Sequence, residues 1–316
     1  MNTKPSREIY IGISLAVLTT LIWSGNFVVA RAAYKQIPPV SLAFYRWFTA
    51  SIIILPFSFK KILSEKKILK KNAGYLFWTA LTGVSLFNTC IYVAGHYSPA
   101  INLALIGTTS SPIMAVILAR IFLKEHISWL RISGLVICIS GILLLMGKGS
   151  FKQIFMLRFS IGDIWILLSA FFFAIYNILV RKKPSSINPV VFMGVVFSLG
   201  TLIIFPFYLF EKFNSPAADW NINLLLIIIY LGLGNSVISY FCWNAAIAKL
   251  GAARTALFGN LIPIFSSIEA LFFLGEKITV IHILSAAMVI TGLVIANFKT
   301  GNSKIAITRE NMTITN

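Results

Sequence analysis

Long apolar runs alternate with short polar segments along nearly the whole chain. Ten runs can be recognised, near residues 10–30, 39–59, 74–95, 98–122, 128–147, 161–180, 188–210, 223–246, 250–274 and 280–298. An α-helix of about 20 predominantly apolar residues is long enough to cross the hydrocarbon core of a bilayer. The pattern therefore predicts an all-α membrane protein with ten transmembrane helices.

The second half of the chain repeats the first. A shift of 150 residues aligns Arg31 with Arg181, and a shift of 151 residues aligns Pro112 with Pro263. The same shifts also align Gly12 with Gly162, Gly83 with Gly234, Ser85 with Ser236, and Gly141 with Gly292. Five spans per half is an odd number, so the second half must lie upside down relative to the first, as in many secondary transporters. We expect one five-helix repeat over residues 8–147, an inverted one over 161–298, and a flexible cytoplasmic tail over 299–316.

Composition supports the assignment to a membrane protein, and the distribution of charge predicts how the chain is oriented in the membrane. The chain is 58% hydrophobic and 11% charged, whereas a soluble domain has roughly 25% charged residues. The net charge of +18 lies mainly in gaps between apolar runs, which argues against nucleic-acid binding. With the N-terminus in the cytoplasm, nineteen of the 27 Lys and Arg residues fall on the inner face and seven on the outer face. The positive-inside rule then predicts that both termini are cytoplasmic.

No pattern in the chain indicates an enzyme, a cofactor or a metal. The three cysteines lie within apolar runs and are expected to be buried free thiols: Cys90, Cys138 and Cys242. The stretch Gly147-Lys148-Gly149-Ser150 lacks the upstream spacing and the strand–helix context of a phosphate-binding loop. No G-x-S-x-G hydrolase motif occurs. We therefore expect a small-molecule substrate and the lipid bilayer as partners.

Several local motifs occur along the chain, and one of them, a mid-span Pro followed by a Glu at the exit of the span, occurs in both halves. They are Trp23-Ser24-Gly25-Asn26-Phe27 in the first span, Arg46-Trp47 in the second, Ser110-Ser111-Pro112 followed by Glu125, and Asn260-Leu261-Ile262-Pro263 followed by Glu276. Over roughly residues 8–298 the chain resembles the drug/metabolite transporter superfamily, specifically its ten-span EamA-type members. The resemblance implies a carrier of metabolites or amino acids, often an exporter, that works without ATP hydrolysis. It also implies that spans one, three, four, six, eight and nine surround a central cavity.

Polar side chains within the spans are the candidates for binding a substrate. Pro112 and Pro263 lie near mid-span, and each frees a backbone carbonyl that a polar pocket could use. Polar stripes with helical spacing run along spans three and eight. The candidate substrate-binding residues are Trp23, Asn26, Asn88, Tyr92, Thr108, Ser111, Tyr176, Asn235, Ser239, Trp243 and Asn260. The alternatives are local helix kinks, hydrogen bonds between helices, and aromatic packing.

Two charged residues lie inside predicted spans. Counting at about 1.5 Å per residue places Arg46 and Glu269 at similar depths, roughly 8–10 Å below the outer surface. A charge within the membrane is usually paired or functional. We therefore predict that Arg46 and Glu269 pair directly or through the substrate, and that both, with Pro112 and Pro263, serve coupling or gating. The alternatives are that Arg46 reaches the outer headgroups and that Glu269 couples transport to protons.

These observations predict a secondary transporter of the cytoplasmic membrane that works by alternating access. The resemblance favours efflux of an amino acid or a related compound. An importer or exchanger of a nucleotide-like metabolite and a multidrug efflux carrier remain alternatives, and a channel or a receptor would be rival classes. Gly134, Gly141 and Gly292 could allow close helix contact, and a homodimer through these helices is one arrangement that would use it.

Overall fold

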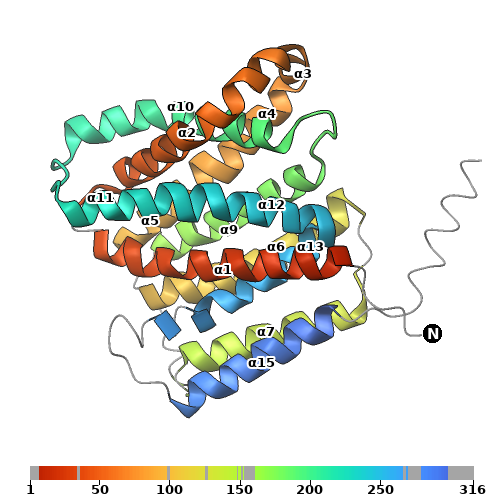
Figure 1. The fold of residues 1–316 in the computed structure, drawn as a ribbon. Coiled ribbons are helices and arrows are strands. Elements are labelled where there is room, and N and C mark those ends of the chain that lie inside the picture. Colours follow the sequence, from red (N-terminus) through yellow and green to blue (C-terminus); the bar gives the residue numbers. More distant parts are fainter. Residues whose placement is uncertain are drawn as a thin grey trace, which may run out of the picture.

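The computed structural model describes residues 7–33, 36–97, 100–124, 127–147, 149–150, 152, 161–265, 268–269 and 279–297. Helices of three kinds make up the regular structure in these ranges, and no strand occurs among them (Figure 1). The all-α prediction is therefore confirmed for the described part of the chain. The predicted tail over 299–316 lies outside the described residues.

Each half of the chain supplies a series of helices in the same order. The first half contains α1 (Arg7–Ala33), α2 (Pro39–Ser64), α3 (Lys66–Lys71), α4 (Ala73–Ala80), η1 (Leu81–Leu86), α5 (Phe87–Tyr97), α6 (Ala100–Phe122) and α7 (Trp129–Met146). The second half contains α9 (Ile161–Arg181), α10 (Pro189–Asn214), α11 (Ile222–Ile229), η2 (Tyr230–Ile238), α12 (Ser239–Leu250), α13 (Ala252–Ala256), η3 (Leu257–Leu261) and α15 (Val280–Asn297).

Within the described part of the chain, six helical stretches are long and apolar enough to cross a membrane. They are Arg7–Asn26, Pro39–Ser64, Ala73–Gly95, Ile161–Arg181, Pro189–Asn214 and Ile222–Leu250. Four shorter apolar helices cover Ile113–Phe122, Trp129–Leu144, Ala252–Phe265 and Ile283–Ala296 within the described residues. Multiple membrane crossings follow from these lengths and compositions.

Two of the long stretches contain a π-helical segment in the middle. In η1, the Ser85 hydroxyl lies 3.5 Å from the carbonyl of Ala80, five residues earlier. In η2, the Ser236 hydroxyl donates to the carbonyl of Leu231, also five residues earlier, at 2.8 Å. The 151-residue shift aligns Ser85 with Ser236, so the π-helical segments lie at equivalent positions of the two halves. π-Helical turns are rare and are often found at functional sites.

Helices α2 and α10 pack against each other and run antiparallel (Figure 1). At the start of α2, the main-chain and side-chain donors of Ser41 bind the carboxylate of Glu211 near the end of α10. At the other end, Ser58 of α2 lies against Gly194 near the start of α10. Glu211 also accepts a hydrogen bond from Val40 N, so its carboxylate caps the positive N-terminus of α2.

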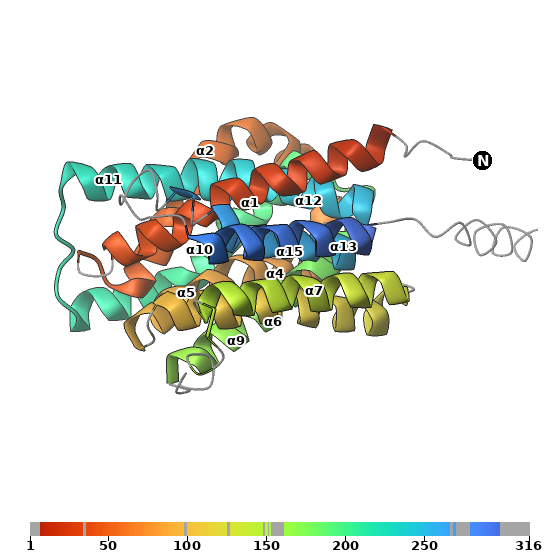
Figure 2. The same cartoon turned by 90° about the horizontal axis from the view of Figure 1, so that it is seen from below.

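Helices α7 and α15 form a second antiparallel pair, visible side by side in Figures 1 and 2. Gly134, early in α7, packs against Gly292, late in α15. Gly141, later in α7, accepts a 2.7 Å hydrogen bond from the hydroxyl of Ser285, earlier in α15. The predicted close contact through these glycines is therefore made within one chain. The homodimer stays a prediction.

Residues that the repeat makes equivalent touch each other at several points. The pairs are Trp23 with Phe173 (ring centroids 5.5 Å apart), Trp47 with Phe197 (4.9 Å), Ser51 with Thr201 (hydroxyls 3.1 Å apart) and the Cys138 thiol with the Val289 carbonyl (3.4 Å). The same surfaces of the two halves therefore face one another. The helix pairs α1–α12 and α5–α9, which correspond under the repeat, are both in close contact.

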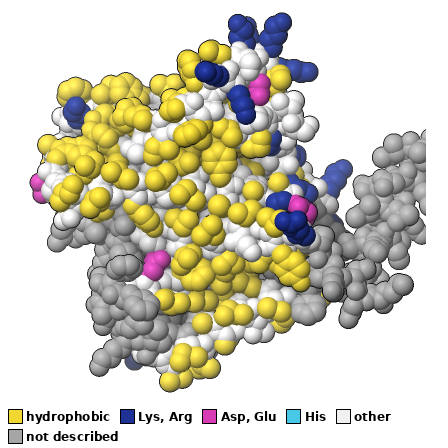
Figure 3. All heavy atoms as spheres, in the orientation of Figure 1, with side chains coloured by type: hydrophobic (Ala, Val, Ile, Leu, Met, Phe, Trp, Pro, Cys, Tyr) yellow, Lys and Arg dark blue, Asp and Glu magenta, His cyan; other side chains and the backbone are white. Residues whose placement is uncertain are grey.

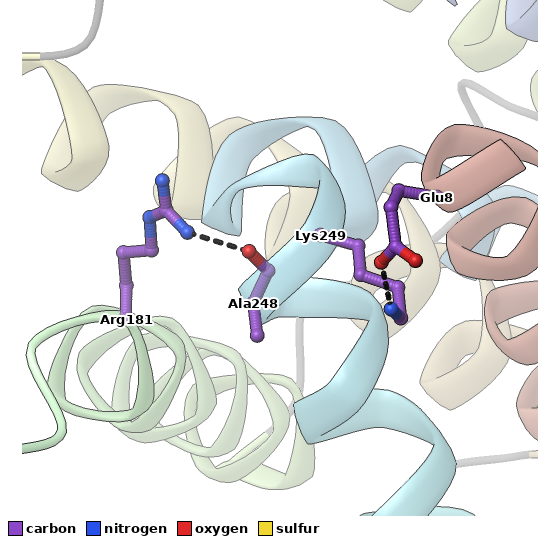
Figure 4. Close-up of polar contacts among 4 residues, drawn as sticks. All are labelled: Glu8, Arg181, Ala248 and Lys249. Carbon is purple, nitrogen blue, oxygen red and sulfur yellow. Dashed lines mark hydrogen bonds and ion pairs between the residues drawn. The ribbon is translucent and has the colours of Figure 1, made fainter. Parts of the chain in front are cut away.

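The surface separates into an apolar belt and a basic end. Figure 3 shows hydrophobic side chains over the middle of the face, and Lys and Arg gathered on the side that carries α3 and the start of α1. Contacts at this end join several helices: Glu8 of α1 pairs with Lys249, and Arg181 donates to the Ala248 carbonyl at 2.9 Å (Figure 4). In the adjoining loop, burial lowers the pKa of the Lys183 ammonium from its usual 10.5, although the charge of Glu65 opposes this shift.

Candidate functional site

Aromatic side chains from both halves form a buried cluster where α1, α9, η2 and α12 meet. Trp23 lies 4.9 Å from Trp243 and 5.9 Å from Tyr240 between ring centroids. Phe173 and Tyr176 of α9 complete the cluster, with Tyr176 lying 5.5 Å from Tyr240. None of these five rings is more than 9% exposed. Aromatic clusters of this kind offer a rigid apolar wall with polar atoms at fixed places.

Each polar atom of the cluster has a partner on another helix. The indole N–H of Trp243 donates to Asn177 Oδ1 at 2.8 Å, and the Tyr176 hydroxyl donates to Asn244 Oδ1 at 2.7 Å. The Tyr240 hydroxyl donates to the carbonyl of Gly83, in η1, at 2.8 Å. The bond from Tyr240 to Gly83 joins the two halves, whereas the other two bonds tie α9 to α12 within the second half.

Arg46 is 1% exposed and binds the π-helical segment of the second half. Its Nε donates to Ser236 Oγ at 2.8 Å, and its Nη2 donates to the main-chain carbonyl of Asn235 at 3.1 Å. Its Nη1 donates to the Tyr92 hydroxyl at 3.0 Å. The guanidinium therefore stays inside the protein and does not reach the outer headgroups. All three acceptors are uncharged groups, so none of them is a counter-ion for the guanidinium.

Glu269 lies beside α1 and contacts a different set of residues. Its Oε1 lies 2.6 Å from the Ser24 hydroxyl. The Tyr230 hydroxyl donates to the carbonyl of Ile22 at 2.6 Å and lies within electrostatic range of both Glu269 and Arg46. In this structure Glu269 and Arg46 therefore have different partners. Their pairing, directly or through the substrate, stays a prediction.

A cavity of about 640 Å³ opens at the end of the molecule where α2 begins and α5 and α10 end. Its lining residues are Gln36, Ile37, Pro38, Pro39, Val40, Val93, Tyr97, Glu211, Ser215, Pro216 and Ala217. Further along α2 and α5 lie Arg46 and Tyr92, so the cavity is bordered by the same helices as the buried charge. This volume is within the range of small-molecule sites.

Most of the predicted site residues lie in the interior. Trp23, Asn26, Arg46, Asn88, Tyr92, Tyr176, Asn235, Ser239, Trp243, Asn260 and Pro263 are buried, whereas Ser111 and Glu269 are partly exposed. The side chains of Thr108 and Pro112 lie outside the described residues. The structure brings Trp23 together with Trp243 and Asn235, and Tyr92 together with Arg46.

Six further residues belong to the same network and were not among the predicted site residues. They are Phe173, Asn177, Tyr230, Ser236, Tyr240 and Asn244. Asn177 is a single amide in an otherwise apolar stretch of α9, which is a usable sequence signal. Phe173 aligns with Trp23 under the 150-residue shift, so the repeat itself could have identified it.

Comparisons with known proteins agree with this architecture. The model of the EamA-like transporter family matches residues 10–147 and 160–298. An uncharacterized transporter of Archaeoglobus fulgidus is 27% identical over 90% of this chain and 96% of its own length. The uncharacterized transporter YyaM of Bacillus subtilis is 28% identical over 91% of this chain and 94% of its own.

A probable amino-acid metabolite efflux pump of Escherichia coli is 24% identical over 90% of this chain and 94% of its own length. A solved crystal structure, 15% identical, covers 93% of this chain and 97% of its own with a TM-score of 0.71, which shows that the fold is shared. Two family matches, one in each half, together cover most of the chain, and its helices are apolar enough for repeated membrane crossing. The chain therefore belongs to the EamA-like transporter family, within the drug/metabolite transporter superfamily, and is a multi-pass membrane transporter.

Proposed function

We propose that the chain crosses the membrane ten times, as two five-helix halves over 8–147 and 161–298 that are inverted relative to each other. The antiparallel packing of α2 with α10 and of α7 with α15 carries this proposal, because the repeat makes the members of each pair equivalent. Equivalent helices of an inverted repeat must run in opposite directions. The contacts between equivalent residues, such as Ser51 with Thr201, also support it, since a two-fold axis would pass between them.

The transport cycle that fits two inverted halves is alternating access. The halves would rock about the aromatic cluster and expose it to one side of the membrane at a time. The π-helical segments η1 and η2 lie where the halves meet, and their widened turns provide natural places for adjustment. Pro112 and Pro263 are the proposed gating positions at matching depths of the two halves.

The proposed cargo is an amino acid or a closely related metabolite, moved outward. The name of the Escherichia coli relative supports this direction and this class of cargo. The interior offers both an apolar wall, formed around Trp23 and Trp243, and a positive pole at Arg46. Such a combination suits a small molecule with an apolar side chain and a carboxylate.

The protein would lie in the cytoplasmic membrane with both termini in the cytoplasm. The basic end carries the exposed lysines of α3, which are Lys66, Lys67, Lys70 and Lys71. At the opposite end, the matching loop near 211–220 carries Glu211 and Asp219 with one basic residue, Lys212. This bias is the one that the positive-inside rule associates with a cytoplasmic face.

Counterflow in proteoliposomes tests the proposal. Vesicles are loaded with an unlabelled amino acid, and uptake of the same labelled amino acid is followed for each of the standard amino acids. A carrier gives transient accumulation for at least one of them, and Trp243→Ala, which removes a ring that is 1% exposed, should abolish it. Trp129→Ala is the control, because Trp129 is 83% exposed and remote from the cluster in sequence and packing. Absence of counterflow for every amino acid, with correctly folded protein in the vesicles, would overturn the proposed cargo.

A further inference from the structure

Three buried side-chain oxygens near α1 accept no hydrogen bond from any described residue. They are Oε2 of Glu269, Oδ1 of Asn235 and Oδ1 of Asn26. Asn235 is 1% exposed and Asn26 is 7% exposed, so bulk water does not serve their oxygens. Unpartnered acceptors in a membrane interior are costly and need a donor or a positive charge.

The three oxygens belong to residues that lie in or against one stretch of α1, residues 22–26. Glu269 is joined to this turn through Ser24, at 2.6 Å, and Asn235 Nδ2 donates to the carbonyl of Ile22 at 3.0 Å. Asn26 belongs to the same stretch of α1, four residues after Ile22. Side chains from three separate parts of the sequence therefore border the same segment of α1.

The donors nearest to this turn are already engaged. The Tyr230 hydroxyl and the Asn235 amide both donate to the Ile22 carbonyl. Arg46 donates to Ser236, to Tyr92 and to the Asn235 carbonyl, and to none of these three oxygens. Among the described residues, no donor serves the three acceptors of this turn, one of which belongs to a carboxyl group.

Gly25 keeps this surface of α1 open. A Cβ atom at this position would lie 2.5 Å from the Tyr230 hydroxyl and 3.7 Å from Glu269 Oε2. Any larger residue would push into the space between α1 and these two groups. Because Gly25 has no side chain, a group bound beside Glu269 could lie close to the backbone of α1.

We propose that Glu269, Asn235 and Asn26 form a binding site for one positively charged group, namely the protonated primary amine of the transported molecule. An ammonium group has three N–H donors and no acceptor, which matches three acceptor oxygens of which one belongs to a carboxylate. This assignment of the cargo's amine rests on the proposed function. A bare monovalent cation satisfies the same oxygens by the same chemistry, and the experiment below separates the two.

Thermal unfolding of the purified protein in detergent measures the binding. The probes are 2-phenylethylammonium chloride, its uncharged N-acetyl derivative, sodium chloride, and choline chloride as a cation without N–H donors. The protonated amine should raise Tm in a saturable manner, because ligand bound to the folded state stabilises it. The acetylated amine and choline should not. In Glu269→Gln the apparent Kd for the amine should rise about tenfold or more, as expected for loss of a charge-assisted contact.

The control is Glu8→Gln, which makes the same chemical change at the far end of α1, where Glu8 pairs with Lys249 on the surface. It should leave amine binding unchanged. If Glu269→Gln fails to fold, Asn26→Asp decides the matter: a second carboxylate should tighten amine binding, and unchanged or weaker binding would overturn the site.

Saturable stabilisation by sodium alone, lost in Glu269→Gln, would assign the site to a free cation and overturn the amine assignment. No effect of either the amine or sodium would overturn the site altogether. Counterflow separates these results from the proposed function. Transport that is indifferent to Glu269→Gln removes the site alone, whereas amine binding without counterflow of any amino acid removes the proposed function alone.

Discussion

Replacing Gly292 by alanine tests the packing of α7 against α15. The added Cβ would lie 2.5 Å from the carbonyl oxygen of Gly134, 2.7 Å from Cys138 Sγ and 2.9 Å from Cys138 N. Ordinary van der Waals contact begins near 3.4 Å, so the helices would have to separate locally by 0.9 Å. Two of the three obstructing atoms belong to the backbone, so no rotation of a side chain relieves the contact.

Two opposing effects determine the result. Overpacking a close contact costs about 1–3 kcal/mol, while alanine gains about 0.8–1 kcal/mol over glycine in a helix interior. Because backbone atoms obstruct the new methyl group, we expect the upper part of the first range and a net loss of about 1–2 kcal/mol. Gly141→Ala should cost less, since its Cβ would meet Met288 Cβ at 2.9 Å and Ser285 O at 3.1 Å.

Thermal unfolding in detergent is the assay, with Gly74→Ala as the matched control. Gly74 lies in α4, and its added Cβ would meet no atom within 4 Å. We expect Tm to fall by a few degrees for Gly292→Ala, by less for Gly141→Ala, and to stay level or rise for Gly74→Ala. A Gly292→Ala protein that unfolds at or above the wild-type Tm would refute the proposed closeness of α7 and α15.

Three further predictions concern other contacts. Glu211→Ala removes the carboxylate that caps α2 and should cost about 1–2 kcal/mol, measured as a fall in Tm. Trp243→Phe leaves Asn177 Oδ1 without its indole donor and should cost about 1–3 kcal/mol; an unchanged Tm would contradict that hydrogen bond. Ser51→Cys with Thr201→Cys, in a chain lacking its natural cysteines, should form a disulfide under mild oxidation because the hydroxyls lie 3.1 Å apart. Mass spectrometry detects the link, and its absence would argue against this contact.

The sequence predicted where individual polar residues lie along their helices. Counting residues placed Arg46 and Glu269 within apolar stretches, and the repeat aligned Ser85 with Ser236 before any contact was known. Each half contributes helices in the order that the repeat predicts, and glycines in the last span of each half make the expected close contact. Hydropathy and spacing report such features directly, because they depend on the chain's own periodicity.

The sequence did not predict which residues these side chains contact, because the contacts depend on the rotation of each helix about its axis. Arg46 binds the carbonyl of Asn235 and the hydroxyl of Ser236 rather than Glu269. That choice depends on η2, whose π-helical turns change which groups face α2. A widened turn shifts the residues beyond it around the axis, and the 3.6-residue periodicity used to analyse a sequence does not include that shift. Tyr230 is the first residue of η2, and its hydroxyl donates to the main-chain carbonyl of Ile22, a partner that side-chain periodicity does not report.

Labelling one cysteine at each of two equivalent positions tests the inverted arrangement most directly. Ser64 at the end of α2 and Asn214 at the end of α10 are exposed, correspond under the 150-residue shift, and make side-chain hydrogen bonds only within their own helices. Ser64→Cys and Asn214→Cys are made separately in a chain without natural cysteines and exposed to a membrane-impermeant maleimide in sealed vesicles of known orientation. We predict that the cysteine at position 64 reacts only from the cytoplasmic side and the cysteine at position 214 only from the external side. Reaction of both from the same side would contradict the inversion of the two halves.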